Sequence, residues 1–439
     1  MKKEIYGIDS FIFGIINGGN EEKGKEKKNR KICLFDIIFW ILIVFTIAIR
    51  VHLAPISISG DFKGYFTDWM NSYSKEPFWK AFGHSFTDYY EPYNFLLDLF
   101  GHTKLPGWLC ISMSSCFFDY LSAYYVYKIV KMLLLDNKSS FIGKFSFINN
   151  IEVSGEFVVD QLSRLAAIVS LMLPIVVMNG ALWKQCDSIY TCFSIISIYY
   201  FFKEQYTVSF LLYGMSFMFK LQSIFLLPFL LIMYICKQKF SLTKFCYIPV
   251  MYVLAGIPAV ICKRGFHATY LKYLVQTQEV PMMSALSPSI YRFGMDYFRE
   301  FGMYAILLTI SVFMIMTALC YLYRKNLDRQ TCFYLVGWSV ITCFLFLPAM
   351  HERYDYMGLV ILSVYMIIFN HKYIWTIIVM NICTTMTYSY YLFDFDSVSL
   401  EWITVAYNIA FAFITVDLIR RICRNNTYEA YNSKKAVFK

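Results

Sequence analysis

Residues 32–51 read ICLFDIIFWILIVFTIAIRV, an apolar run of 20 residues in which only Asp36 and Arg50 carry a formal charge. At 1.5 Å per residue, a helix of this length crosses the roughly 30 Å hydrocarbon core of a bilayer. Similar runs recur at approximately 109–133, 163–180, 188–202, 206–219, 222–236, 244–262, 302–323, 331–347, 356–370, 373–389 and 402–419. The sequence therefore predicts an all-α, polytopic membrane protein with about 12 transmembrane helices.

The composition agrees with this prediction. Of the 439 residues, 58% are hydrophobic and 16% are charged, and the mean hydropathy is +0.50. Such a composition excludes a soluble enzyme, a disordered chain and a disulfide scaffold. The 13 cysteines form no CxxC motif and no Cys/His metal spacing, so we expect neither a zinc site nor a disulfide framework.

The distribution of positive charge predicts the topology. An even number of spans places both termini on one side of the membrane. That side carries most of the 40 lysines and arginines; they lie in 21–31, at Lys138 and Lys144, and in 237–244, 324–329 and 420–439. The positive-inside rule then makes both termini cytoplasmic in a plasma membrane. We expect basic tails at 1–31 and 420–439, a transmembrane domain at 32–419, and a first span that acts as an uncleaved anchor. The net charge of +10 thus indicates orientation and attraction to lipid, not nucleic acid.

Four segments are expected on the outward side: 52–108, 181–187, 263–301 and 348–355. The stretch 75–104 is aromatic and mildly amphipathic, which favours one or two helices lying in the interface. Its aromatic residues are expected at headgroup depth; these are Trp79, Tyr89, Tyr90 and Tyr93.

The outward segments also carry the polar side chains that could form a site. The first holds Asp61, Asp68, Trp69 and, directly after Gly64, Tyr65. The others hold Lys184, Gln185, Asp187, Arg292, His351, Glu352 and Arg353. The run 206–236 is too long for one ordinary span, so Lys220 and Gln222 are expected to mark an outward apex.

Each of these features also has a purely structural interpretation. Asp61 and Asp68 could be solvated surface carboxylates, and His351 to Arg353 could be a salt-bridged turn at the interface. Lys220 could snorkel to the membrane surface. Asp119, in the middle of the second span, is expected to hydrogen-bond to a neighbouring helix.

The motifs taken together resemble a known family. The sequence has Gly60-Asp61 after a first span that ends in Arg50, Trp-x-Gln-Cys-Asp-x-Ile-Tyr at 183–190, Phe-Lys-Leu-Gln-x-Ile-Phe-Leu-Leu-Pro at 219–228, and Leu-Pro-x-Met-His-Glu-Arg-Tyr at 347–354. This set resembles the bacterial GT-C membrane glycosyltransferases related to the GPI mannosyltransferases. It is more loosely similar to the dolichyl-phosphate-glucose glucosyltransferases, which carry His-Glu-Lys at the last motif. The sequence departs from the pattern in having Thr67-Asp68 where related proteins often have a proline.

The resemblance implies a GT-C-like fold and the inverting transfer of a sugar, mannose or another hexose, from a polyprenyl-phosphate carrier to a glycan or glycolipid acceptor. Asp61 would be the catalytic base, with Asp68 as the alternate. The donor phosphate would be bound by His351, Arg353, Lys220 and Arg292. The sugar or substrate would be bound by Lys184, Gln185, Asp187, Gln222, Glu352, Tyr65 and Trp69. No cofactor or metal is expected, because the first loop has no Asp-x-Asp sequence.

Two other classes remain open. A polysaccharide polymerase or ligase would also use polyprenyl-linked sugars, and an outward loop with Arg264, Arg292 and Arg299 suits it. A flippase or other transporter could also have twelve spans, but its halves usually repeat, and no internal repeat is visible here.

Overall fold

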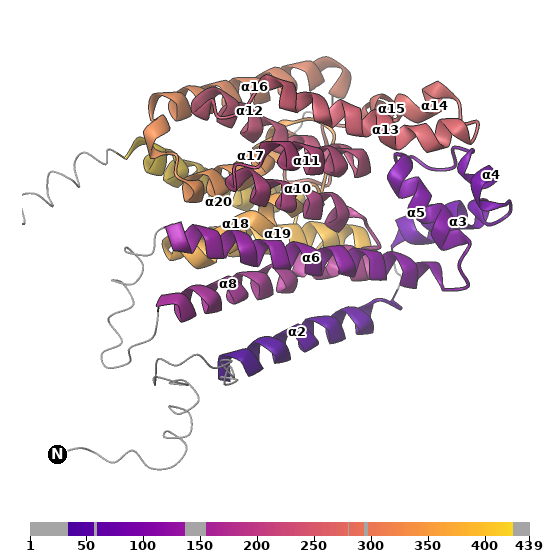
Figure 1. Ribbon diagram of the computed structural model, residues 1–439, viewed down its shortest axis with the longest axis horizontal. Coiled ribbons are helices and arrows are strands. Elements are labelled where there is room, and N and C mark those ends of the chain that lie inside the picture. The colour runs from indigo at the N-terminus through magenta and orange to yellow at the C-terminus, as the bar shows by residue number, and fades with distance from the viewer. Residues whose placement is uncertain (1–33, 57–58, 137–154, 280, 294–296, 425–439) are drawn as a thin grey trace, which may run out of the picture.

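The computed structural model describes residues 34–56, 59–136, 155–279, 281–293 and 297–424. They form a bundle of long helices with a group of short helices, α3, α4 and α5, at one end (Figure 1). Helix α2 begins, and α20 ends, at the opposite end of the bundle (Figure 1). The predicted tail 1–31, the loop with Lys138 and Lys144, and residues 425–439 of the second tail lie outside the described residues.

The long helices are α2 (Leu34–Leu53), α6 (Gly107–Asp136), α8 (Gly155–Met172), α10 (Asp187–Phe202), α11 (Tyr206–Phe219), α12 (Leu227–Lys237), α13 (Tyr247–Ile261), α16 (Phe298–Leu322), α17 (Arg329–Phe346), α18 (Tyr356–Phe369), α19 (Ile374–Phe393) and α20 (Leu400–Cys423). The end group comprises the π-helix η1 (Asp61–Phe66), α3 (Thr67–Tyr73), α4 (Phe78–Phe82) and α5 (Glu91–Gly101). The other short helices are α9 (Pro174–Val177), the π-helix η2 (Met178–Trp183), α14 (Phe266–Tyr270), α15 (Lys272–Glu279), and the 3₁₀ turns η3 (Leu221–Leu226), η4 (Leu242–Cys246), η5 (Ile290–Arg292), η6 (Arg324–Asn326) and η7 (His371–Tyr373).

The only strands in the described chain are β1 (Ser284–Ala285) and β2 (Met350–His351), which pair in parallel. The described chain is therefore all-α apart from this contact, which fastens the 263–301 segment to the 348–355 segment. Each of the twelve predicted apolar runs coincides with a described helix or helix pair.

Four helices are long and apolar enough to cross a membrane: Leu34–Leu53, Leu242–Ile261, Phe298–Leu322 and Leu400–Cys423. A bent pair, Gly155–Met172 with Pro174–Trp183, would make a fifth. Large apolar side chains of α2, α13 and α16 point outward from the bundle, which suits contact with lipid. These features are compatible with a membrane protein, and the number of twelve spans stays a prediction.

The core of the bundle is formed by α17 and α18, whose side chains are buried almost all round. Both helices are apolar on every face, as expected for helices enclosed by others. Helix α17 packs against α16, α18 and α20, and α18 packs against α8, α17 and α19. The segment 348–355, which links these two helices, is thus held by the most rigid part of the molecule.

The apolar run 163–180, predicted as one span, is not one continuous helix. Helix α8 ends at Met172, and Pro174 starts a new helical segment bent by 55° from it. Proline has no amide hydrogen and its ring collides with the carbonyl four residues earlier, so it breaks the helix here. After the break, η2 approaches α6 so closely that a Cβ at Gly180 would lie 2.8 Å from Ser115 Cβ.

A buried arginine stabilises this break. Arg50 donates to the Leu171 carbonyl at 2.9 Å and lies 3.5 Å from Asp119. Tyr356 of α18 donates to the same carboxylate at 2.8 Å. The expectation that Asp119 bonds a neighbouring helix is therefore confirmed.

The helices predicted within 75–104 are confirmed as α4 and α5, but the position of their tyrosines is not. Trp79 is exposed, whereas Tyr90 and Tyr93 are buried. The reason is that α5 packs against α11 and α13, where the ring of Tyr90 stacks on Tyr252 with a centroid distance of 3.9 Å. These two rings are therefore enclosed by protein, and their depth in a membrane stays a prediction.

Candidate functional site

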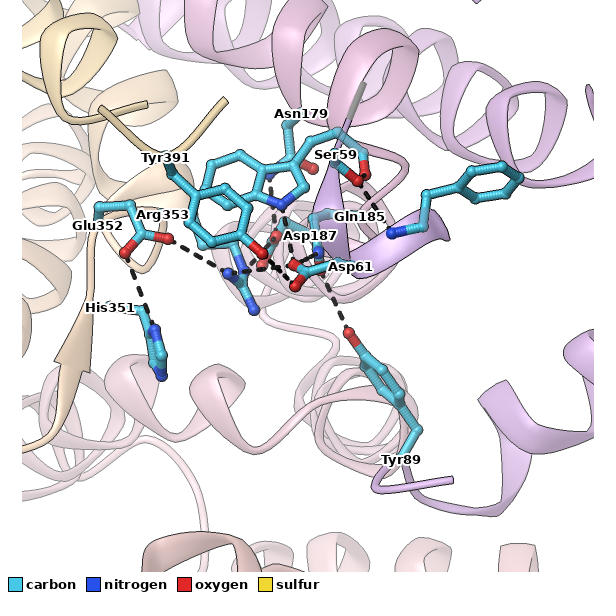
Figure 2. A network of polar contacts seen from close by, with 12 residues as sticks. Ser59, Asp61, Tyr89, Asn179, Gln185, Asp187, His351, Glu352, Arg353 and Tyr391 are labelled. Carbon is cyan, nitrogen blue, oxygen red and sulfur yellow. Dashed lines mark hydrogen bonds and ion pairs between the residues drawn. The ribbon is translucent and has the colours of Figure 1, made fainter. Parts of the chain in front are cut away.

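Segments that are far apart in the sequence meet at the end of the bundle that carries α3 to α5. They are the start of η1, the link between η2 and α10, the end of α11, the turn between β2 and α18, and the end of α19. Their polar side chains form one network of hydrogen bonds and ion pairs (Figure 2).

Asp61 lies at the centre of this network, on the first turn of η1. Its Oδ2 accepts hydrogen bonds from Trp183 Nε1 at 2.9 Å and from Gln185 Nε2 at 2.7 Å, and its Oδ1 accepts one from the Tyr391 hydroxyl. The ring of Tyr391 stacks on that of Trp183 at 4.7 Å. Three donors on two segments thus fix the orientation of a carboxylate that is still partly exposed.

Arg353 lies beside this carboxylate. Its Nη1 is 4.0 Å from Asp61 Oδ2 and 3.3 Å from Glu352 Oε1, and its Nε is 3.9 Å from Asp187 Oδ2. The guanidinium also lies over the Trp183 ring, 5.2 Å from its centroid. One planar cation is therefore shared by three carboxylates, a geometry that the fork of an arginine permits.

Lys220 supplies the second cation. Helix α11 ends at Phe219, Lys220 adopts an extended conformation, and η3 begins at Leu221, so the predicted break in the run 206–236 is confirmed. The Lys220 ammonium is buried and lies 2.5 Å from Asp187 Oδ1. Asp187 Oδ2 also accepts a hydrogen bond from Asn179 at 3.0 Å. The Lys220 ammonium is therefore held in the network by Asp187 and does not snorkel to the membrane surface.

His351 and Glu352 complete the network on the side of β2. Glu352 is almost fully buried, with Oε2 3.8 Å from His351 Nδ1. Burial raises the pKa of Glu352 to about 7, against the opposing effect of Arg353. Burial, helped by Arg353 and Lys220, lowers the pKa of His351 to about 3, so its imidazole is neutral at physiological pH.

The backbone conformation at the end of η2 decides which side chains enter the site. Lys184 adopts a left-handed conformation with φ of 66°. Its ammonium turns inward to the Ala181 carbonyl and is fully buried, and this burial lowers its pKa to about 8. The next residue, Gln185, is directed to Asp61, while Ser115 holds its carbonyl at 2.8 Å. Lys184 was expected to bind substrate, but the structure directs its side chain away from the network.

The other predicted residues lie outside the network. Asp68 and Tyr65 are exposed, while Trp69 packs on Tyr89 with ring centroids 6.0 Å apart. Gln222 is half-buried on η3. Arg292 donates to Ser284, which pairs with Met350 next to His351, so Arg292 lies beside the site on the neighbouring loop.

Four residues of the network were not predicted to act in the site. Trp183, which donates to Asp61, was noted only as part of the 183–190 motif. Tyr391 comes from α19, and Asn179 from η2. Tyr89, expected at the membrane surface, donates to Gln185 Oε1 at 3.2 Å. Asn179 and Tyr89 stand near the predicted motifs, but nothing in the sequence distinguishes Tyr391 from the other 35 tyrosines.

Arg264 is engaged elsewhere. Its guanidinium pairs with Glu91 and donates to the carbonyls of Phe82 and His84, and both charged side chains are buried. One of the three arginines that suited a polymerase or ligase is thereby occupied in holding α4 and α5 to the end of α13.

The end group of helices also borders an apolar groove of about 420 Å³. It lies between α5 and the helices α11 and α13, and its lining includes Phe95, Leu96, Phe219 and Ala255. Phe219 directly precedes Lys220, so the groove and the cationic part of the site share one segment of chain.

No group of three or more His, Cys, Asp or Glu side chains within the described ranges is arranged to hold a metal ion. The chemistry available to the network is that of an oriented carboxylate beside one cation, Arg353, with a second cation, Lys220, joined to Arg353 through Asp187. Such a pair of functions suits the removal of a proton on one side and the stabilisation of an anion on the other.

A search against models of known protein families found no match, and none of the curated proteins compared is significantly similar to this chain.

Proposed function

We propose that this protein is a membrane glycosyltransferase that moves a hexose from a polyprenyl-phosphate carrier to an acceptor hydroxyl, with inversion at the anomeric carbon. The observation that carries the proposal is the position of Asp61, which is fixed by three donors and lies 4.0 Å from the guanidinium of Arg353. A base and an anion-binding cation are thus held side by side by separate parts of the chain. The motif resemblance described above supports the same conclusion.

The reaction needs a base on the acceptor. The acceptor oxygen bonds to the anomeric carbon while the bond from that carbon to the phosphate oxygen breaks, and the bonding electron pair leaves with the phosphate. The hydroxyl proton passes to Asp61 and from there to solvent. Proton removal by a positioned carboxylate typically accelerates a reaction by about 10² to 10⁴-fold.

The leaving phosphate needs positive charge. Lys220 is buried and Arg353 is largely enclosed, and in such a place a preorganised cation stabilises developing charge more strongly than in water. A phosphate is already a good leaving group, so the reaction needs no acid catalyst to protonate the oxygen that links it to the anomeric carbon. Gln185, Asp187 and Trp183 contact Asp61 or one of the two cations and are the candidates for sugar contacts.

The apolar groove supports a lipid-linked donor. Its lining includes Phe219, and the next residue in the chain is Lys220. A molecule with a hydrocarbon chain and an anionic head would place the chain in the groove and the head at the cation. We therefore assign the groove to the polyprenyl chain.

The proposed setting is a plasma membrane with both termini cytoplasmic and the site on the outer face. Helix α2 begins, and α20 ends, at the end of the bundle opposite to α3–α5 (Figure 1), in agreement with this orientation. The partners would be the lipid-linked donor, a glycan or glycolipid acceptor, and membrane lipids, without nucleic acid or cofactor.

The test uses the purified full-length protein in lipid nanodiscs. It is incubated with radiolabelled polyprenyl-phosphate mannose, glucose or galactose and a glycolipid extract as the acceptor. We expect one donor to be consumed and its sugar to appear on the acceptor with the opposite anomeric configuration. Failure to consume any of the donors, or a product that retains the configuration, would contradict the proposal.

A further inference from the structure

The described network carries more negative than positive charge. Asp61, Asp187 and Glu352 surround the single guanidinium of Arg353, at 4.0, 3.9 and 3.3 Å. Lys220 is the second cation, and His351 is neutral. With three ionised carboxylates against two cations, the empty site has one excess negative charge. A bound phosphodiester would raise that excess to two in a buried place, which is strongly unfavourable.

The three carboxylates are not equally supported. Asp61 accepts hydrogen bonds from three side chains, and Asp187 is held by Lys220 and Asn179. Glu352 accepts a side-chain hydrogen bond only from Arg353, beside one from its own backbone amide, while the His351 nitrogen at 3.8 Å is beyond hydrogen-bond distance. Glu352 is also almost fully buried, and burial raises its pKa to about 7. Glu352 is therefore the carboxylate that gains a proton at least cost.

We propose that the site binds the phosphodiester of its donor together with one proton, and that Glu352 takes up this proton. The inference rests on the proposed function, which supplies the phosphate. The proton comes from bulk solvent and converts the Glu352 carboxylate to a carboxylic acid, and no bond of the donor breaks in this step. The network then keeps one excess negative charge, as in the empty site. Arg353 also loses its closest carboxylate partner, so its Nη1 becomes available to the phosphate.

Other charged and titratable groups face Glu352. They are His351, Arg353, Tyr354 and Asp355 of its own turn, Asp61 of η1, and Tyr391 of α19. Asp187 of α10 and Lys220 at the end of α11 are joined to Glu352 through Arg353. Among these, Asp355 is the second carboxyl whose pKa burial raises to about 7. However, its Oδ2 accepts hydrogen bonds from Thr384 and Tyr407, so it is directed away from the guanidinium and toward α19 and α20.

The test measures binding of farnesyl methyl phosphate, a diester whose charge stays constant between pH 5.5 and 9, to the full-length protein in nanodiscs. For the wild type we expect a nearly constant Kd below about pH 6.5 and a weakening that approaches tenfold per pH unit above the pKa of Glu352. Titration calorimetry in two buffers of different ionisation enthalpy should show an uptake approaching one proton at pH 8.5 and almost none at pH 6. This second measurement needs no variant.

Substitutions then identify the residue. Glu352→Gln should bind with a Kd that does not change with pH and should be at least tenfold tighter than the wild type at pH 8.5. Asp355→Asn, and Asp88→Asn on an exposed loop, should keep the wild-type slope. A wild-type Kd that is independent of pH, or a slope that survives in Glu352→Gln, would overturn this inference and leave the proposed function standing. No binding at any pH would overturn both.

Discussion

Replacement of Arg264 by methionine should loosen the end group of helices from the bundle. Arg264 pairs with Glu91 and donates to the carbonyls of Phe82 and His84, and the two charged side chains are 1% and 0% exposed. Arg264→Met leaves a buried carboxylate and two buried carbonyl groups without this donor. Loss of one partner of a buried ion pair typically costs about 3–5 kcal/mol. That is a large share of the total stability of about 5–15 kcal/mol that a typical domain has.

The loss should be local, because α4 and α5 depend on this pair for their attachment to the end of α13. Hydrogen exchange of the backbone amides measures such local opening directly. We expect the amides of α4 and α5 to exchange about 10² to 5 × 10³-fold faster in Arg264→Met, since each 1.36 kcal/mol corresponds to about a factor of ten. The amides of α17 and α18, in the centre of the bundle, should keep their protection.

The pH dependence of the same variant follows from Glu91. Burial raises the pKa of Glu91, and Arg264 opposes this rise. A carboxyl with a folded-state pKa above its unfolded value contributes stability at low pH, and this contribution is lost as the pH rises. The opening caused by Arg264→Met should therefore be smallest near pH 5 and largest near pH 8.

Two controls make the test decisive. Lys80→Met breaks the exposed pair with Glu76 and should change stability by less than about 1 kcal/mol. The double variant Glu91→Leu with Arg264→Met removes both charges and should recover most of the protection. Unchanged exchange in Arg264→Met, or a double variant as open as the single one, would refute the reasoning.

Further predictions concern the site and the groove. Tyr391→Phe removes one hydrogen bond to Asp61 and should lower the rate of sugar transfer about 10 to 100-fold with little change in the KM of the sugar donor. An unchanged rate would exclude this positioning role. Ala255→Trp fills the groove and should raise the KM of a long-chain donor but not that of a ten-carbon donor. The control Leu322→Trp, on the exposed face of α16, should change neither KM. Equal effects of Ala255→Trp on both donors would refute the assignment of the groove. Treatment with EDTA should leave transfer within about twofold of the untreated rate, and a loss restored by a divalent cation would show that the reaction needs a metal.

The long helices could be predicted because a helix enclosed by lipid or by other helices needs a long run of apolar residues, which is visible in the sequence. The break at Lys220 was predictable from the length of the run 206–236. The break at Pro174 was missed although the proline was visible, because the apolar run continues past it. Hydropathy reports where a segment lies and not whether its helix is straight.

The site was predictable only where its residues belong to short motifs. Gln185 and Arg353 were singled out in this way, and both contact Asp61. The inward turn of Lys184 depends on one left-handed residue at the end of a π-helix, which composition does not reveal. Tyr391 enters from the end of α19, more than 300 residues from Asp61, and only the three-dimensional packing brings the two together.

The most direct test of the central claim is the single-turnover rate of sugar transfer by Asp61→Asn, measured in nanodiscs with the radiolabelled donor that the wild type uses. We expect the rate to fall about 10² to 10⁴-fold while donor binding is retained. The exposed-loop variant Asp88→Asn should react at the wild-type rate. Transfer by Asp61→Asn at the wild-type rate would contradict the assignment of Asp61 as the base, and loss of transfer in Asp68→Asn alone would move that role to Asp68.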